Sequence, residues 1–201
     1  MSQEYRAAID DIVARRRSIR KYKNDPVPKN LVLKVVEAAR LAPSASNRQP
    51  WRFYIVDDEI SKERLRQSQG VKQPFVLEAP VCVVCCADMS VYSTAETESA
   101  IKGLVDSGDL DPNGLDGYWA WWNQVAQGPD LARLAFLDVG IAVEHMALAA
   151  TAYGLGTCWM RRIDPEAIAK ALSLPKDYAV IAPYWQWVFP RKSRNRGLTN
   201  R

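Results

Sequence analysis

The residues best suited to chemistry are basic side chains gathered in two short stretches, one near each end of the sequence. Residues 15–23 (RRRSIRKYK) contain six basic residues, residues 191–201 (RKSRNRGLTNR) contain five, and neither stretch contains an acid. Without these eleven, the chain has 16 basic against 23 acidic residues, a net charge of −7. Two compact basic clusters on an acidic body favour binding of a small anion such as a phosphate. The alternative is that both stretches are solvated, flexible ends.

Other reactive residue types do not combine into a recognisable centre. Cys82, Cys85 and Cys86 form a CxxCC pattern, but in a β-strand Cys82 and Cys85 point to opposite faces, which is wrong for a shared metal or a redox pair. The sole histidine, His145, lacks partners for a metal site, and no GxSxG, Walker or GxGxxG motif is present. We therefore expect no metal and no catalytic side chain, which suits hydride chemistry supplied by a cofactor.

Length and composition predict a single globular domain over residues 1–201. The chain is 48% hydrophobic and 25% charged, which excludes a disordered protein. Its best candidate for a membrane span, residues 136–153, is interrupted by Asp138, Glu144 and His145, so no membrane association is expected. With no apparent signal peptide, and with cysteines too few for a disulfide framework, the expected location is the cytoplasm.

Hydrophobic periodicity predicts helices and strands that interleave in an α+β or α/β arrangement. Helices are expected over 2–16, 31–42, 61–69, 96–105, 129–153 and 164–172, and strands over 51–57, 79–87, 157–160 and 178–190. Ser2 is predicted to cap the first helix. The nearly continuous apolar run 79–87 is typical of a strand that is covered on both faces.

A cluster of aromatic residues lies in the segment between about residues 90 and 128, whose secondary structure is hard to predict. The cluster consists of Tyr118, Trp119, Trp121 and Trp122. Tryptophans this close together cannot all face one side of a helix, so at least one is expected to be exposed, at an interface or over a ligand. The cluster either packs in a core or dimer interface, or forms a lid that stacks on a planar aromatic substrate.

Several motifs in a fixed order make the sequence resemble the nitroreductase family of FMN-dependent oxidoreductases. RRSIR (16–20) follows the first predicted helix, PSASNRQPW (43–51) precedes the first strand, and APVCVVCCAD (79–88), YGLGTCWM (153–160) and KSR (192–194) come later. The resemblance covers nearly the whole chain except about 90–128, where a variable substrate lid is expected. It implies an α+β nitroreductase-like fold, with a central, mostly antiparallel sheet flanked by helices and a basic C-terminal arm (190–201) that reaches a partner subunit.

The same resemblance implies where the FMN phosphate would bind. The residues implied at or near the phosphate are Arg16, Arg17, Ser18, Lys192 and Arg194. Arginine suits this role because its guanidinium group forms bidentate, charge-assisted bonds to phosphate. Arg20 matches the basic residue that family members place at the pyrimidine edge of the flavin, where positive charge stabilises the anionic reduced ring.

Three further segments are implied at the flavin ring. The partner-subunit loop would be formed by Pro43, Ser44, Ala45, Ser46 and Asn47, so that the site is complete only in a homodimer; the alternative is a helix stop followed by a turn. Trp159, Met160 and Arg161 would pass over the ring, with a backbone N–H directed at the reactive N5. Gln73 matches an amide that often binds the flavin. Several family members have an acidic residue near this position, where this chain has Arg161 and Arg162, so the local hydrogen bonding and the substrate charge preference do not follow from the resemblance.

The resemblance implies an enzyme, an NAD(P)H-dependent flavin oxidoreductase. NADH or NADPH would reduce FMN, and a nitroaromatic, quinone or related acceptor would then reoxidise it by a ping-pong hydride mechanism. The sequence leaves two alternatives: other flavin chemistry on the same fold, such as reductive dehalogenation or flavin cleavage, and a non-enzymatic flavin-, nucleotide- or nucleic-acid-binding protein. The expected partners are a second copy of the chain and a small-molecule acceptor, without nucleic acid or membrane.

Overall fold

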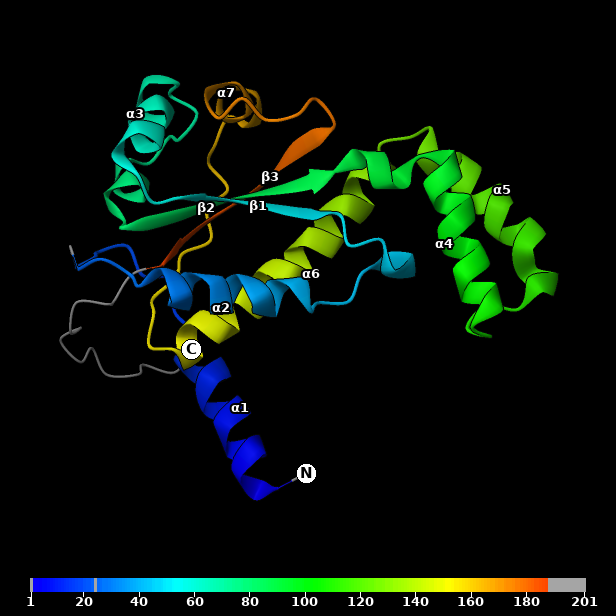
Figure 1. Cartoon of the computed structure of the whole chain (residues 1–201), viewed down its shortest axis with the longest axis horizontal. Coiled ribbons are helices and arrows are strands. Elements are labelled where there is room, and N and C mark those ends of the chain that lie inside the picture. The colour runs from blue at the N-terminus through cyan, green and yellow to red at the C-terminus, as the bar shows by residue number, and fades with distance from the viewer. Residues whose placement is uncertain (1, 24, 188–201) are drawn as a thin grey trace, which may run out of the picture.

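The computed structural model describes residues 2–23 and 25–187 (Figure 1). Its helices are α1 Gln3–Arg15, α2 Lys29–Arg40, α3 Glu59–Gln67, α4 Thr94–Asp106, α5 Leu115–Ala126, α6 Asp130–Ala152 and α7 Pro165–Ala171. Its strands are β1 Trp51–Val56, β2 Val81–Asp88 and β3 Tyr178–Trp187. Short 3-10 turns occur at η1 Ala45–Asn47, η2 Pro74–Glu78, η3 Met89–Tyr92 and η4 Pro112–Gly114.

The sheet in this part of the chain has three strands in the order β1-β2-β3, and both pairs are antiparallel. Trp51 lies opposite Ala87 in one pair, and Val84 lies opposite Tyr184 in the other. All eight residues of the central strand β2 are buried, as the continuous apolar run predicted. The α+β arrangement with an antiparallel sheet flanked by helices is therefore confirmed.

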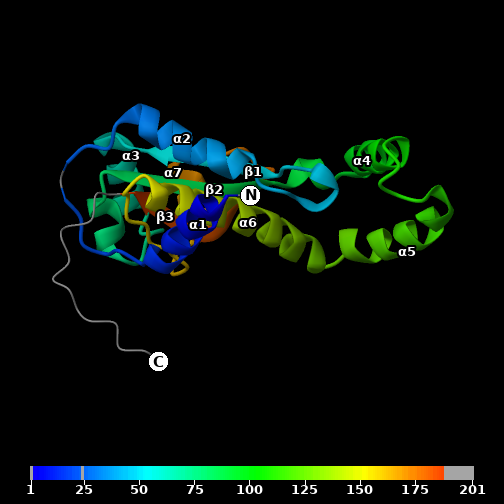
Figure 2. The same cartoon turned by 90° about the horizontal axis from the view of Figure 1, so that it is seen from below.

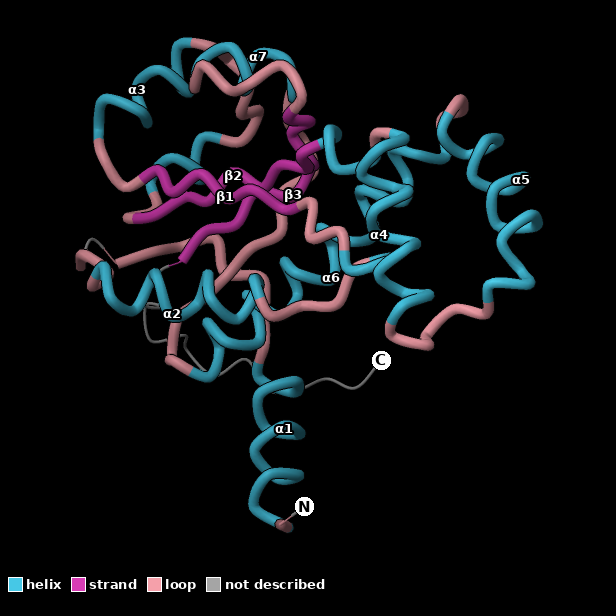
Figure 3. The backbone as a smooth tube through the Cα atoms, turned by 45° about the vertical axis from the view of Figure 1, so that its right-hand side comes forward, coloured by secondary structure: helices cyan, strands magenta, loops and turns pink. Residues whose placement is uncertain are grey.

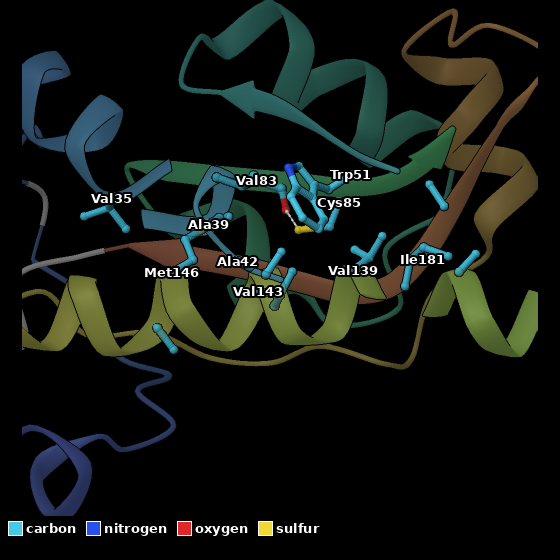
Figure 4. Close-up of a cluster of buried hydrophobic side chains, with 14 of the residues drawn as sticks. Val35, Ala39, Ala42, Trp51, Val83, Cys85, Val139, Val143, Met146 and Ile181 are labelled. Carbon is cyan, nitrogen blue, oxygen red and sulfur yellow. Dashed lines mark hydrogen bonds between the residues drawn. The ribbon is translucent and has the colours of Figure 1, made fainter. Parts of the chain in front are cut away.

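Each face of β2 packs into a different hydrophobic cluster. Val83 and Cys85 face a cluster formed with α2 and α6, and Figure 4 shows these side chains beside Trp51 and Val143. The alternate residues, Cys82, Val84 and Cys86, face a second cluster that α3 and α7 cover. The prediction that Cys82 and Cys85 point to opposite faces is confirmed. The described residues contain no group of three or more His, Cys, Asp or Glu side chains that could hold a metal.

Helix α6 is the main helix of the first cluster. It is the one helix in the described part of the chain that is long and apolar enough to span a membrane. Its buried stripe, however, consists largely of small residues such as Ala142 and Ala147 that pack beneath the sheet and against α2 (Figures 1 and 2). The composition of α6 is therefore that of a core helix.

Three local predictions need correction, and one segment that the sequence left open can be assigned. Residues 157–160 form no strand in the described part of the chain; Thr157 makes an isolated parallel bridge with Ser18, and a second isolated bridge joins Val71 to Ile163, beyond the predicted strand. Helix α3 begins two residues before Ser61, because the Asp58 carboxylate accepts a hydrogen bond from the Ser61 N–H at 2.7 Å. Ser2 stands at the N-cap of α1, but its side chain makes no capping hydrogen bond. Finally, the aromatic cluster lies on a regular helix, α5.

Two parts of the chain extend away from the sheet. Helices α4 and α5 project together beyond one end of the sheet (Figure 1). Helix α1 projects on the side of α2 that faces away from the sheet (Figures 1 and 3). No residue of α1 is buried, although Tyr5, Ile9 and Val13 form an apolar stripe at helical spacing. These apolar side chains are therefore available for contact with another molecule.

Burial controls the reactivity of the cysteines. It raises the pKa of the Cys86 thiol to about 12 and that of Cys85 well above its usual value. Because the thiolate is the reactive form, we expect the folded protein at pH 8 to react with an aromatic disulfide reagent at least ~100-fold more slowly than the unfolded chain. All four cysteines should react after unfolding in guanidinium chloride. Rapid labelling of any cysteine in the folded protein would contradict this account.

Candidate functional site

The basic segment after α1 lies against the segment that follows α6. The Ile19 N–H donates to the Thr157 carbonyl at 2.8 Å, and Ser18 pairs with Thr157 in a parallel bridge. A Cβ at Gly156 would lie 2.7 Å from Ile19 Cγ1, so glycine permits this close approach. Two motifs that are more than 130 residues apart in the sequence are thus neighbours in the structure.

Several cations surround this junction. The half-buried Arg16 places its Nε 3.9 Å from Glu144 Oε1 on α6, whereas Arg17 and Arg20 are exposed and form no ion pair with any described residue. Burial raises the pKa of the Cys158 thiol, and the charges of Arg20 and Arg16 oppose that effect. Guanidinium groups without carboxylate partners suit an incoming anion.

Two buried hydroxyl groups at the same junction have no hydrogen-bond partner among the described residues: Thr157 Oγ1 and the Tyr22 hydroxyl. Burial raises the pKa of Tyr22, so this hydroxyl keeps its proton and remains a donor. A buried polar atom without a partner costs about 1–3 kcal/mol. The donors around the Ser18–Thr157 bridge therefore fit a ligand that is rich in acceptor oxygens, such as a phosphate with an attached polar ring.

Gln73 lies beside Arg161, which follows the segment 156–160. The Lys72 N–H donates to the Arg162 carbonyl at 3.4 Å, which brings Gln73 alongside Arg161. Arg161 is exposed, but the Met160 side chain is buried in the second cluster, so Met160 could contact a ligand only through its backbone. Gln73 and Arg161 are thus neighbours, whereas the Met160 side chain packs in the second cluster with Ile19 and Tyr22; contact of Gln73 and Arg161 with a flavin stays a prediction.

Two of the predicted phosphate ligands, Lys192 and Arg194, lie outside the described residues, as does the rest of the predicted C-terminal arm. The meeting of both basic stretches at one anion therefore remains a prediction. Within the described residues, the predicted phosphate-binding segment consists of the basic residues Arg16, Arg17 and Arg20 together with Ser18.

The loop over residues 43–49 is more constrained than a simple turn. Ser46, Asn47 and Gln49 have φ values of 49°, 51° and 49°, in the left-handed region that favours glycine. The Ser44 hydroxyl accepts a hydrogen bond from the Gln49 N–H at 2.8 Å, and the Ala45 N–H donates to Asp138 Oδ1 at 3.0 Å. No hydrogen bond or ion pair joins this loop to residues 16–20 of the same chain in the described part, and α2 separates them in Figure 1.

Sequence reasoning missed three residues that hold this loop. The Asp138 carboxylate, only 3% exposed, also accepts a hydrogen bond from the Tyr92 hydroxyl at 3.0 Å. Arg48 donates from Nη1 to the Val91 carbonyl at 2.8 Å, and its guanidinium carbon lies 4.7 Å from the centre of the Trp122 ring. The available signal was a single carboxylate on the buried stripe of an otherwise apolar helix.

The aromatic cluster divides into buried and exposed members. Trp122 is buried and stacks on Tyr92, which is the core packing that the sequence analysis gave as the alternative to substrate contact. Tyr118 and Trp119 are half-buried and Trp121 is 46% exposed, which confirms that the cluster cannot face one side. A cavity of about 530 Å³ lies between the 43–49 loop and α4, and its lining contains none of the four aromatic residues.

A sequence model described as the nitroreductase family matches residues 13–106 and 119–184. The chain is 34% identical over 169 residues to the NADH dehydrogenase of Thermus thermophilus, covering 84% of this chain and 80% of that protein. It is 27% identical over 185 residues to the 5,6-dimethylbenzimidazole synthase of Rhodospirillum rubrum, and the match covers 89% of this chain and 80% of that protein. A solved structure from Exiguobacterium sibiricum, described as a nitroreductase in complex with FMN, has a TM-score of 0.72 and 26% identity, covering 96% of this chain and 93% of that one.

Proposed function

The chain belongs to the nitroreductase family, and from that premise we propose that it is an FMN-dependent oxidoreductase that takes electrons from NADH or NADPH. The acceptor in this proposal is a nitroaromatic, a quinone or a related compound, reduced in the second half of a ping-pong cycle. The observation that carries the proposal is the junction of residues 16–20 with residues 156–160. There, Arg17 and Arg20 form no ion pair with any described residue, and the buried Thr157 and Tyr22 hydroxyl groups have no hydrogen-bond partner among those residues. A cytoplasmic location, where thiols stay reduced, is part of the same proposal.

The residues at this junction bind and orient the cofactor. Arg16 and Arg17 hold its phosphate, together with Lys192 and Arg194 from the C-terminal end of the chain. Arg20 stabilises negative charge on the reduced ring, and the backbone of residues 159–161 positions the ring. FMN, when bound, supplies the hydride chemistry, so no catalytic acid, base or nucleophile is required from the protein.

The proposed enzyme is a homodimer in which Ser44, Ala45, Ser46 and Asn47 reach the cofactor of the partner. Two observations support this assembly: within one chain the loop makes no hydrogen bond or ion pair with residues 16–20, and α1 carries an apolar stripe that no described residue covers. A 13-residue helix is only marginally stable alone in water. A second copy that covers α1 would stabilise the helix and complete both sites.

A second candidate is different flavin chemistry on the same fold. The Rhodospirillum rubrum relative, which covers 89% of this chain, is named as a synthase of 5,6-dimethylbenzimidazole. The exposed Arg161 and Arg162, beside the segment proposed to position the flavin, also allow a negatively charged acceptor.

The test of function is a stopped-flow experiment on FMN-loaded protein. We expect NADH or NADPH to bleach the flavin absorbance, and nitroaromatic or quinone acceptors to restore it. Absence of bleaching with both nicotinamides would overturn the reductase proposal. Consumption of the flavin itself would favour the second candidate.

Arg16 and its neighbour Arg15 form a matched pair for testing the phosphate site. Arg15 is exposed and pairs with Asp11 at 3.0 Å, whereas Arg16 faces the junction. Loss of a charged hydrogen bond costs about 1.5–3 kcal/mol, so Arg16→Ala should weaken FMN binding by roughly 10- to 100-fold and lose FMN during gel filtration. Arg15→Ala should retain it. Full retention by Arg16→Ala would move the phosphate to other residues.

The apolar stripe on α1 gives a test of the dimer. Ile9 is 59% exposed at the centre of the stripe, and Ala7 lies on the opposite side of the same helix. We expect Ile9→Lys to shift the protein toward monomer in gel filtration with light scattering, and to lose FMN with the dimer. Ala7→Lys, which adds the same charge, should remain dimeric. A dimeric Ile9→Lys variant would remove α1 from the interface.

A further inference from the structure

We propose that Asp138 is a positioning residue that holds the 43–49 loop in the conformation able to reach a flavin. The proposal rests on the proposed function, in which this loop contributes Ser44, Ala45, Ser46 and Asn47 to the cofactor site of the partner. Asp138 itself would not touch the cofactor. It would act through its hydrogen bond to the Ala45 N–H, whose N···Oδ1 distance is 3.0 Å.

The loop needs such a restraint because its backbone is strained. Ser46, Asn47 and Gln49 are all in the left-handed region, and none of them is glycine. Outside glycine, a left-handed residue costs about 1–2 kcal/mol, less for asparagine. Strain of this kind persists only where surrounding contacts over-determine the backbone, and it is concentrated at functional sites. In the described part of the chain, two hydrogen bonds reach the loop backbone from outside: Asp138 accepts from the Ala45 N–H in the middle of the loop, and Arg52 donates to the Gln49 carbonyl at its end at 3.2 Å.

The Asp138 carboxylate is itself costly to the fold. It is only 3% exposed, it lies on the buried stripe of α6 beside Ala135, Val139 and Ala142, and burial raises its pKa. No cation of the described residues forms an ion pair with it. An apolar residue of similar size would pack against the same neighbours without the desolvation penalty. A group that costs stability and restrains a strained loop is better explained by positioning than by stability.

Tyr92 and Arg48 extend this restraint to the opposite side of the loop. The Tyr92 hydroxyl donates to Asp138 Oδ2 at 3.0 Å, and the Tyr92 ring lies 5.4 Å from the Arg48 guanidinium carbon. Arg48 directly follows η1, and it packs over the buried Trp122 of α5. The loop is therefore fixed both to α6, through Ala45, and to α5, through Arg48. One network of contacts therefore fixes the position of the loop relative to both α5 and α6.

The test compares Asp138→Leu with Asp138→Asn, using Asp130→Leu as a control. Leucine is similar in size but accepts no hydrogen bond, whereas asparagine keeps an oxygen for the Ala45 N–H and an amide that the Tyr92 hydroxyl can accept from. Asp130 is an exposed residue near the start of the same helix, paired with Arg133. Three quantities are measured for each variant: the FMN dissociation constant, the Tm of the FMN-free protein, and hydrogen exchange of residues 44–49 without FMN.

We expect Asp138→Leu to bind FMN at least tenfold more weakly and to exchange faster at residues 44–49, while its FMN-free Tm is unchanged or higher. Asp138→Asn should bind FMN within about threefold of the parent, and Asp130→Leu should match the parent in all three quantities. If Tm and FMN affinity both fell in Asp138→Leu, Asp138 would stabilise the fold as a whole, and the positioning role would be overturned. Unchanged FMN affinity and unchanged exchange would overturn the proposal outright.

Two further outcomes keep this test separate from the proposed function. If the parent protein binds no FMN, the proposed function fails, and faster exchange of residues 44–49 in Asp138→Leu still tests whether Asp138 holds the loop. If Asp138→Leu does not fold, Tyr92→Phe replaces it, because this change removes one hydrogen bond and keeps the ring. Tyr92→Phe should weaken FMN binding by about threefold, and unchanged binding and exchange in that variant would contradict the network.

Discussion

The burial of β2 on both faces is the constraint on which the rest of the structure depends. A strand without an exposed face needs a layer of helices on each side, and the chain supplies α2 and α6 on one side and α3 and α7 on the other. The position of α6 follows directly from this requirement. Because α6 packs against the sheet, it carries Asp138 and Glu144 at defined places, Asp138 against the loop and Glu144 near Arg16.

Where one physical effect dominates, the sequence was sufficient to predict the fold. The apolar run at 79–87 predicted a buried strand, the small-residue repeat from 129 to 153 predicted a packed helix, and the structure contains both. Prediction failed where tertiary contacts decide. Residues 157–160 have the composition of a strand, but the described chain offers them only isolated bridges. The aromatic residues of α5 directly follow a stretch rich in Gly, Asp, Asn and Pro, which obscures the start of that helix in the sequence.

In the candidate site, too, some residues could be predicted from the sequence and others could not. The motifs that resemble the nitroreductase family point to residues 16–20 and 159–161, and the structure places Ser18 of the first segment beside Thr157, just before the second. Asp138 was noticed in the sequence only as an interruption of an apolar stretch. Its partner Ala45 is 93 residues away and Tyr92 is 46 away, so no local pattern links them. Only the fold shows that this carboxylate faces a loop with left-handed backbone.

In the proposed dimer, helix α6 serves two different flavins. Glu144 lies near Arg16 of its own site, while Asp138 holds the loop that enters the site of the partner. The two residues are six positions apart on one helix, which is about 9 Å along its axis. A small shift of α6 would therefore be transmitted to both centres at once. The two sites of the dimer would not be independent copies, and cooperativity between them would require the movement of a single helix rather than of a domain.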